Sequence, residues 1–76
     1  MKKSGSSILI QGEYITLGQL LKFLDLVSTG GEEKIFVATH DITFNGEKET
    51  RRGKKLRDHD VVSIDGEKYN ICTSPD

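Results

Sequence analysis

A regular spacing of leucines constrains the fold of this 76-residue chain most strongly. Leu17 is followed by three further leucines, at distances of three, four and seven positions: Leu20, Leu21 and Leu24. This spacing predicts an α-helix with one buried face. Thr16 stands where the helix would begin, and Gln19 supplies the reciprocal partner of a capping box. Gly18 inside this helix costs about 1 kcal/mol relative to alanine, so we expect another backbone or a ligand to approach it closely.

A glycine pair separates this helix from a second one. The segment Ser28-Thr29-Gly30-Gly31 ends the first helix and permits a sharp turn. The second helix is expected from Gly31 to about Thr39, because Glu32 and Glu33 favour the positive N-terminal end of a helix. Its apolar side is assigned to Ile35, Phe36 and Ala38. Two helices joined by so tight a turn are expected to pack at a steep angle.

Alternating apolar residues and turn signals predict a small sheet beside the helices. The expected strands fall at 7–11, 14–15, 42–44, 61–64 and 69–71. Asn45-Gly46 gives the strongest short-range signal for a hairpin, and Asp65-Gly66 predicts another. The fold class is therefore α+β, with two N-terminal helices packed on a small, strongly bent antiparallel sheet. We expect one domain over residues 8–72, with flexible tails at 1–7 and 73–76.

The strongest functional signal is a basic run from Thr50 to Arg57. Five of its eight residues are Lys or Arg and none is acidic, although the whole chain has a net charge of -1. Clustered Lys and Arg are how a small protein binds the phosphate backbone of a nucleic acid. We expect the run to be a loop between strands of one small sheet. The run alone leaves open a solvated loop whose charge serves solubility.

Other residues give no sign of catalysis. Cys72 has no basic neighbour, so we expect it to be half-buried in a strand of a cytoplasmic protein. The apolar run Ile8–Ile10 is too short to cross a membrane. His40 and His59 lack the spacing of metal ligands and are assigned to a helix end and a turn. Enzyme activity, a cofactor, a metal and a membrane partner are not expected. We assign three aromatic residues to the hydrophobic core rather than to stacking on nucleic-acid bases: Phe23, Phe36 and Phe44.

The order of these features resembles the S4 RNA-binding domain, and more narrowly the small stand-alone S4-like proteins of the YaaA type found in bacteria. The residues that carry the resemblance are Tyr14-Ile15-Thr16-Leu17-Gly18-Gln19-Leu20-Leu21-Lys22, Ser28-Thr29-Gly30-Gly31, Asn45-Gly46-Glu47, Arg51-Arg52-Gly53-Lys54-Lys55-Leu56-Arg57-Asp58 and Asp60. In that family, two helices and the following loop form a basic surface that fits structured RNA, often ribosomal RNA. The resemblance implies an S4-like fold and the same activity, exerted by a monomer on ribosomal RNA, ribosomal subunits or an assembly intermediate.

The resemblance also implies which residues contact RNA. Carried over by position, they are Thr16, Gln19, Lys22, Lys34, Lys48, Arg51, Arg52, Lys54, Lys55 and Arg57. The broad family usually has arginine at the start of both helices, where this chain has Thr16 and Gly30. The basic run is therefore expected to supply most of the positive charge.

A second hypothesis comes from another class of function. The chain would then be a small protein-interaction module without RNA, using a sheet edge or the acidic side of its helices. The carboxylates offered to a basic partner protein would be Glu32, Glu33 and Asp41.

Overall fold

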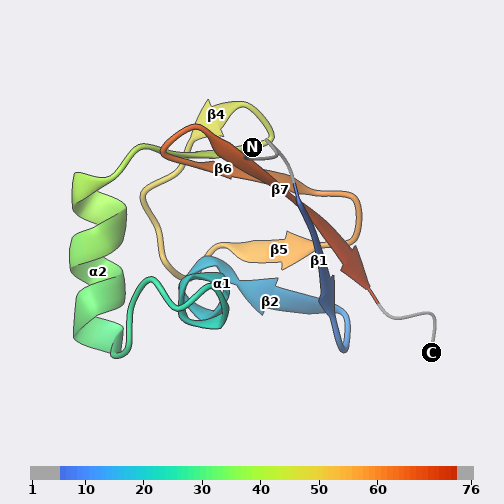
Figure 1. The fold of residues 1–76 in the computed structure, drawn as a ribbon, viewed down its shortest axis with the longest axis horizontal. Coiled ribbons are helices and arrows are strands. Elements are labelled where there is room, and N and C mark those ends of the chain that lie inside the picture. The colour runs from blue at the N-terminus through green and yellow to red at the C-terminus, as the bar shows by residue number, and fades with distance from the viewer. Residues whose placement is uncertain (1–5, 74–76) are drawn as a thin grey trace.

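The computed structural model describes residues 6–73, which form seven strands and two helices (Figure 1). The elements are β1 (Ser6–Ile10), β2 (Tyr14–Thr16), α1 (Leu17–Phe23), α2 (Gly30–Thr39), β3 (Ile42–Phe44), β4 (Glu47–Lys48), β5 (Lys55–Arg57), β6 (Val61–Ile64) and β7 (Glu67–Thr73). Two strands precede α1, so the description of two N-terminal helices on a sheet is wrong in its order. Most residues of the two expected tails, 1–7 and 73–76, lie outside the described part of the chain.

The main sheet is mixed rather than purely antiparallel, which corrects the expected fold. Its five strands lie in the order β1-β7-β6-β3-β4. β1 runs parallel to β7, whereas β7 with β6 and β6 with β3 are antiparallel pairs. In the parallel pair, Ile8 lies opposite Ile71 and both side chains are buried. A parallel pair joins segments far apart in the sequence, so no local turn signal predicts it.

Part of the basic run is a strand rather than a loop. β5 pairs with β2 in a separate two-stranded antiparallel sheet, below the main sheet in Figure 1. Leu56, in the middle of β5, is fully buried and lies opposite Ile15. The basic run therefore crosses from the main sheet to a second sheet, and Leu56 anchors it in the core.

Capping boxes begin both helices, and the first was expected from the sequence. Gln19 N donates to Thr16 Oγ1 at 3.2 Å, and Thr16 N donates to Gln19 Oε1 at 2.8 Å. Thr29 and Glu32 form the same arrangement at the start of α2. The leucine stripe is also confirmed, since the residues buried in or packed against the core include Leu17, Leu20, Leu21 and Leu24.

The inward face of α2 differs from the expected one. Its least exposed side chains and that of its C-cap residue follow the helical spacing of one face: Glu33, Phe36, Val37 and His40. Ile35 is 64% exposed and Ala38 is also exposed, so assigning these two residues to the apolar side was wrong. The inward face includes two titratable side chains, and this explains why apolar residues alone pointed to the wrong side of the helix.

Both expected hairpins are confirmed by their backbone geometry. The φ angles are 50° and 91° at Asn45 and Gly46, and 51° and 91° at Asp65 and Gly66. Two successive positive φ angles are what a two-residue type I′ hairpin turn requires. The turns therefore fix the antiparallel pairs β3–β4 and β6–β7.

One of the three phenylalanines does not lie in the core. Phe36 and Phe44 pack against the core as expected, but Phe23 is 64% exposed. Phe23 is the last residue of α1 and comes two positions after Leu21, so it points away from the leucine face. Its assignment to the core was wrong.

Candidate nucleic-acid interface

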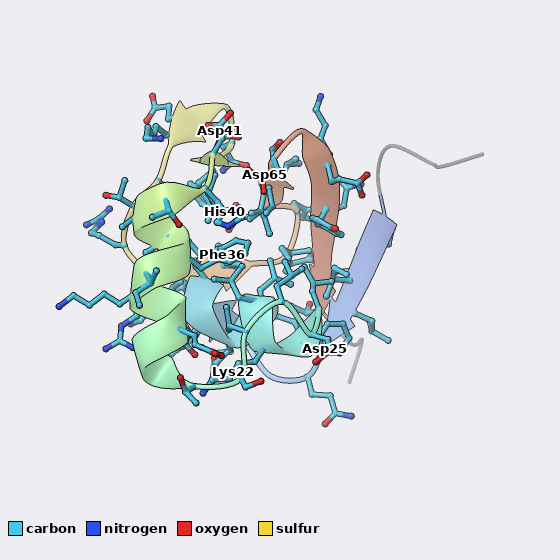
Figure 2. All side chains as sticks on the ribbon, turned by 60° about the vertical axis from the view of Figure 1, so that its left-hand side comes forward. Lys22, Asp25, Phe36, His40, Asp41 and Asp65 are labelled. Atoms are coloured by element: carbon cyan, nitrogen blue, oxygen red, sulfur yellow. The ribbon has the colours of Figure 1, made fainter. Side chains whose placement is uncertain are left out.

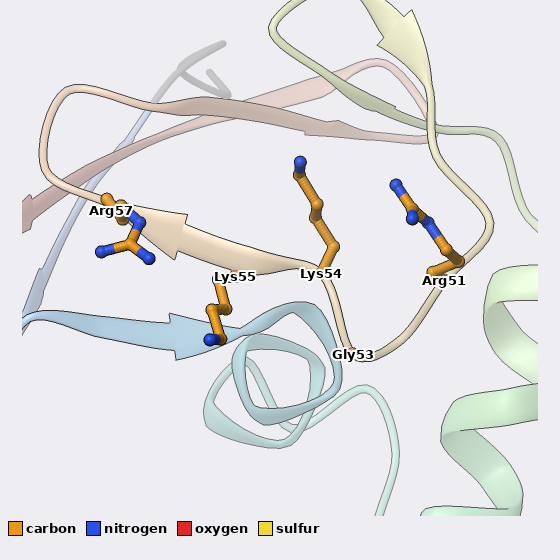
Figure 3. Close-up of a pocket in the computed structure, with 5 residues that line it drawn as sticks. All are labelled: Arg51, Gly53, Lys54, Lys55 and Arg57. Carbon is orange, nitrogen blue, oxygen red and sulfur yellow. The ribbon is translucent and has the colours of Figure 1, made fainter.

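The basic run lines an open hollow on one side of the molecule. The hollow has a volume of about 530 Å³, and its lining residues are Arg51, Gly53, Lys54, Lys55 and Arg57. Figure 3 shows Arg51 and Lys54 pointing the same way from the segment that leads into β5, with Lys55 and Arg57 on the strand itself. Positive side chains therefore surround this hollow.

The backbone of the basic run is fixed by the start of α1. Leu17 N donates to the carbonyl of Lys54, and Gly18 N donates to the carbonyl of Arg52, both at 2.8 Å. The first N–H groups of a helix have no partner inside the helix, so these bonds satisfy two of them. The helix and the basic run thus form one unit.

A buried carboxylate on α2 pairs with two of the cations that were expected to contact RNA. Glu33 is 8% exposed, and its oxygens lie 3.2 Å from Lys22 Nζ and 3.4 Å from Arg52 Nη1. Arg52 Nη1 also donates to the carbonyl of Gly30 at 2.6 Å. A Cβ atom on Gly18 would overlap this carboxylate, because Glu33 Cδ lies 2.6 Å from its position. The sequence led us to expect another backbone or a ligand close to Gly18, but the group in that space is the Glu33 side chain, which the sequence did not predict.

Arg51 is paired with a neighbouring acid. Glu49 Oε2 accepts hydrogen bonds from Arg51 N at 2.9 Å and from Arg51 Nε at 3.1 Å. Burial by itself would raise the pKa of Glu49, but the hydrogen bonds and charge of Arg51, with the N–H of Thr50, hold that pKa below its usual range. The same side-chain hydrogen bond raises the pKa of Arg51. The Arg51 side chain is largely exposed, so it lines the hollow while it remains paired.

The other cations of the basic run make no ion pair within residues 6–73: Lys54, Lys55 and Arg57. Each lies over an aromatic ring instead. Lys54 Nζ is 4.4 Å from the ring centroid of Phe44. Lys55 Nζ and Arg57 Cζ are 5.0 Å and 5.4 Å from the ring centroid of Tyr14. An exposed cation–π contact contributes about 0.5–1 kcal/mol, which leaves these charges available to an anion.

The aromatic partners were missed by the sequence analysis. Phe44 was assigned to the core and Tyr14 to a strand, and neither was assigned a contact with a cation. Tyr14 lies opposite Arg57 only because β2 pairs with β5. Alternating side chains along each strand indicate which residues share a face. The sequence does not indicate how two strands so far apart pair with each other.

The other expected RNA-binding residues contribute unequally. Thr16 and Gln19 use their side chains in the capping box of α1. Lys34 is exposed on α2 and lines neither of two hollows beside the basic run. The second hollow, of about 330 Å³, is lined in part by Lys48, Arg51 and Lys54. Five of the expected residues thus gather around the two hollows: Lys48, Arg51, Lys54, Lys55 and Arg57.

The acidic side expected for a protein partner is not a continuous surface. Glu33 is buried and paired. Glu32 Oε1 accepts hydrogen bonds from Ser28 N at 2.5 Å and from Thr29 N at 3.3 Å, so it stabilises the start of α2. Glu32 and Asp41 are both exposed, but the Glu32 carboxylate is engaged with the backbone at the start of α2. This geometry gives little support to a docking site for a basic protein on the helices.

A histidine–aspartate pair closes the opposite end of α2. Figure 2 shows Phe36, His40 and Asp65 side by side; the rings of Phe36 and His40 stack with centroids 3.7 Å apart, and His40 Nδ1 lies 2.6 Å from Asp65 Oδ2. The hydrogen bond from His40, together with the N–H of Asp41, lowers the pKa of Asp65. His40 thus ends the helix, as expected, and ties it to the β6–β7 turn.

Within residues 6–73, no group of three or more His, Cys, Asp or Glu side chains is placed to hold a metal ion. Neither described helix is long and apolar enough to cross a membrane. Cys72 is half-buried in β7, as expected.

The chain is similar to known proteins over most of its length. The family model of the S4 domain matches residues 8–72, which include both helices and the whole basic run. Over 59 residues the chain is 48% identical to a protein of Bacillus subtilis (strain 168) named "Probable ribosome maturation protein RlbA". That match covers 78% of this chain and 83% of the relative. The chain therefore belongs to the S4 domain family.

Proposed function

We propose that this protein binds structured RNA, and specifically ribosomal RNA or a ribosome assembly intermediate, as a monomer and without catalysing a reaction. One observation carries the proposal: three cations of the basic run stand on a fixed backbone and make no ion pair within residues 6–73, namely Lys54, Lys55 and Arg57. The relative named for ribosome maturation supports a ribosomal partner.

The strand geometry suits contacts to a phosphate backbone. Lys55 and Arg57 are separated by one residue on β5, so they lie on the same face of the strand, about 6.6 Å apart along it. Arginine offers two parallel hydrogen bonds to a phosphate, and lysine offers a compact charge. Phosphate contacts fix the position of a protein on RNA, and the fit of the surrounding surface to a groove or junction adds selectivity.

The test is a pair of matched charge reversals. Lys55 on β5 and Lys68 on β7 are both exposed strand lysines, and only Lys55 lines the hollow. Lys55→Glu and Lys68→Glu would be compared with the wild type by filter binding to purified ribosomal RNA and to ribosomal subunits over a series of salt concentrations. Lys34→Glu would measure separately what the exposed face of α2 contributes.

We expect Lys55→Glu to weaken binding by about tenfold or more and to lower the slope of log K against log salt by about 0.7 to 0.9 for the lost contact. Lys68→Glu should stay close to the wild type. Equal losses in the two variants would assign the binding to net charge alone. Unchanged affinity in the Lys54→Glu/Lys55→Glu double variant would rule out the hollow as the RNA site.

A further inference from the structure

The outer face of the β2–β5 ribbon places an aromatic ring among the cations of the proposed RNA site. Tyr14 pairs with Arg57 and Thr16 pairs with Lys55 in this antiparallel register. Since side chains alternate along a strand, these four residues share one face. The opposite face carries Ile15 and Leu56, which pack in or against the core.

Tyr14 is not needed to fill the core. Its side chain is on the solvent face of the ribbon, the residue is 40% exposed, and its ring contacts the cations of Lys55 and Arg57. Tyr69, by comparison, packs against the hydrophobic core. The chain thus holds one tyrosine for packing and presents the other beside two cations that form no ion pair within residues 6–73.

We infer that Tyr14 is a stacking platform for an unpaired RNA base whose flanking phosphates are bound by Lys55 and Arg57. The inference rests on the proposed function and narrows its substrate class to RNA with a bulged or looped-out nucleotide. Aromatic side chains stack on any base, because every base has a π-face. Bases inside a duplex are already stacked on each other, so only an unpaired base reaches such a ring.

Binding would exchange one set of contacts for another. In the free protein the two cations lie over the Tyr14 ring. Both side chains are long and exposed, so rotation carries their charges from the ring to a phosphate and leaves a ring face open to a base. An exposed cation–π contact is weaker than the stacking of a base on an aromatic residue, and the charge-assisted contact with phosphate adds to the gain.

A purely structural role makes a different prediction. If Tyr14 served only to hold Lys55 and Arg57 in place, its loss would weaken binding to every RNA alike. If Tyr14 stacks on a base, its loss weakens binding only where an unpaired base is available. Tyr14→Phe keeps the ring, whereas Tyr14→Leu keeps an apolar side chain but has no π-face.

The experiment uses a short RNA hairpin with one bulged 2-aminopurine and the same hairpin with that base paired; in both, a non-nucleotide linker replaces the terminal loop, so that no other base is unpaired. Affinity is measured for the wild type, Tyr14→Phe and Tyr14→Leu, and the fluorescence of 2-aminopurine reports stacking on the protein. We expect Tyr14→Leu to bind the bulged hairpin about tenfold more weakly and to lose the protein-dependent fluorescence quenching. Tyr14→Phe should behave like the wild type, and the paired hairpin should bind all three proteins equally.

The possible failures are distinguishable. Equal loss on both hairpins, or unchanged quenching in Tyr14→Leu, overturns the stacking role while leaving RNA binding intact. Binding to ribosomal RNA but to neither hairpin also overturns it, because stacking is tolerant of sequence. Absence of binding to ribosomal RNA and to both hairpins overturns the proposed function itself.

Discussion

The two ends of the basic run use the same residue types in opposite ways. At its start, Arg51 pairs with Glu49 and Arg52 pairs with Glu33, and both carboxylates are largely buried. On β5, the cations Lys55 and Arg57 lie over the ring of one exposed tyrosine. Within residues 6–73, these two form no ion pair.

The difference teaches that charge counted in a sequence is not the charge available to a ligand. A buried carboxylate such as Glu33 keeps its cations, because an unpaired charge with little access to water is costly. A cation over an exposed ring loses little when it moves to a phosphate. The start of the run therefore holds the fold together, and its end remains free to bind. Variants at each end of the basic run can test this contrast.

The largest effect on stability is expected from Gly18→Ala. In an ordinary helix this change stabilises by about 1 kcal/mol. Here the new Cβ would overlap the Glu33 carboxylate, whose Cδ lies 2.6 Å from that position. Moving Glu33 aside disturbs its pairs with Lys22 and Arg52. We expect the free energy of unfolding in urea to fall by about 1–3 kcal/mol.

Gly31→Ala is the matched control, since it also lies in a helix. A Cβ atom on Gly31 meets only Thr29 Oγ1, at 3.9 Å. This variant should be as stable as the wild type or more so, and the cost of Gly18→Ala should shrink in a Glu33→Ala background. A Gly18→Ala protein more stable than the wild type would mean that Glu33 moves freely and does not organise the start of the run.

Removing the Arg52 side chain should lower stability but leave the salt dependence of RNA binding unchanged. Arg52→Ala loses the hydrogen bond to the Gly30 carbonyl at 2.6 Å and the contact with Glu33 at 3.4 Å. Because the side chain is half exposed, we expect a loss of only about 1 kcal/mol in urea unfolding. The backbone bond from Gly18 N to the Arg52 carbonyl survives the change and keeps the run in place. A reduced salt slope would place Arg52 among the phosphate contacts after all.

Arg57→Ala should show the reverse pattern. This arginine makes no ion pair within residues 6–73, so the free energy of unfolding should change by less than about 0.5 kcal/mol. The loss of one phosphate contact should lower the salt slope by about 0.7 to 0.9. Filter binding and urea unfolding on the same preparation would compare Arg52→Ala directly with Arg57→Ala. If both variants lose stability and both have a lower salt slope, the two ends of the basic run do not differ in role.

The sequence predicted those parts of the molecule that depend on neighbouring residues. The capping box of Thr16 and Gln19 and the positive φ angles at Asn45-Gly46 follow from side-chain and backbone chemistry within a few positions. The leucine stripe of α1 follows from helical spacing alone. The basic run was visible as charge, and the resemblance to the S4 domain gave it a role.

Features that depend on pairing across the chain were beyond the sequence. The parallel pair β1–β7 and the register of β2 with β5 join residues more than thirty positions apart, so Tyr14 could not be placed beside Arg57. The sequence also did not show which cations of the basic run pair with a carboxylate and which lie over an aromatic ring. This division depends on Glu33, which was expected to favour the N-terminal end of α2 or to meet a basic partner protein, but which lies in the packed interior next to Gly18.

A smaller effect on stability than that of Gly18→Ala is expected from Glu49→Gln, and it depends on pH. Hydrogen bonds from Arg51 and Thr50 outweigh burial and lower the pKa of Glu49 from a usual value of 4.5. A carboxylate with a lowered pKa stabilises the fold above its unfolded pKa, and this contribution disappears as the pH falls through the folded pKa. Glutamine keeps the shape without the charge, so the variant should lose less than about 1 kcal/mol at neutral pH and nothing in strong acid. Urea unfolding at about pH 7 and about pH 2 measures both limits. A loss that is equal at the two pH values would mean that Glu49 holds Arg51 by shape alone, and Arg51 would then belong with Lys55 and Arg57 as charge available to RNA.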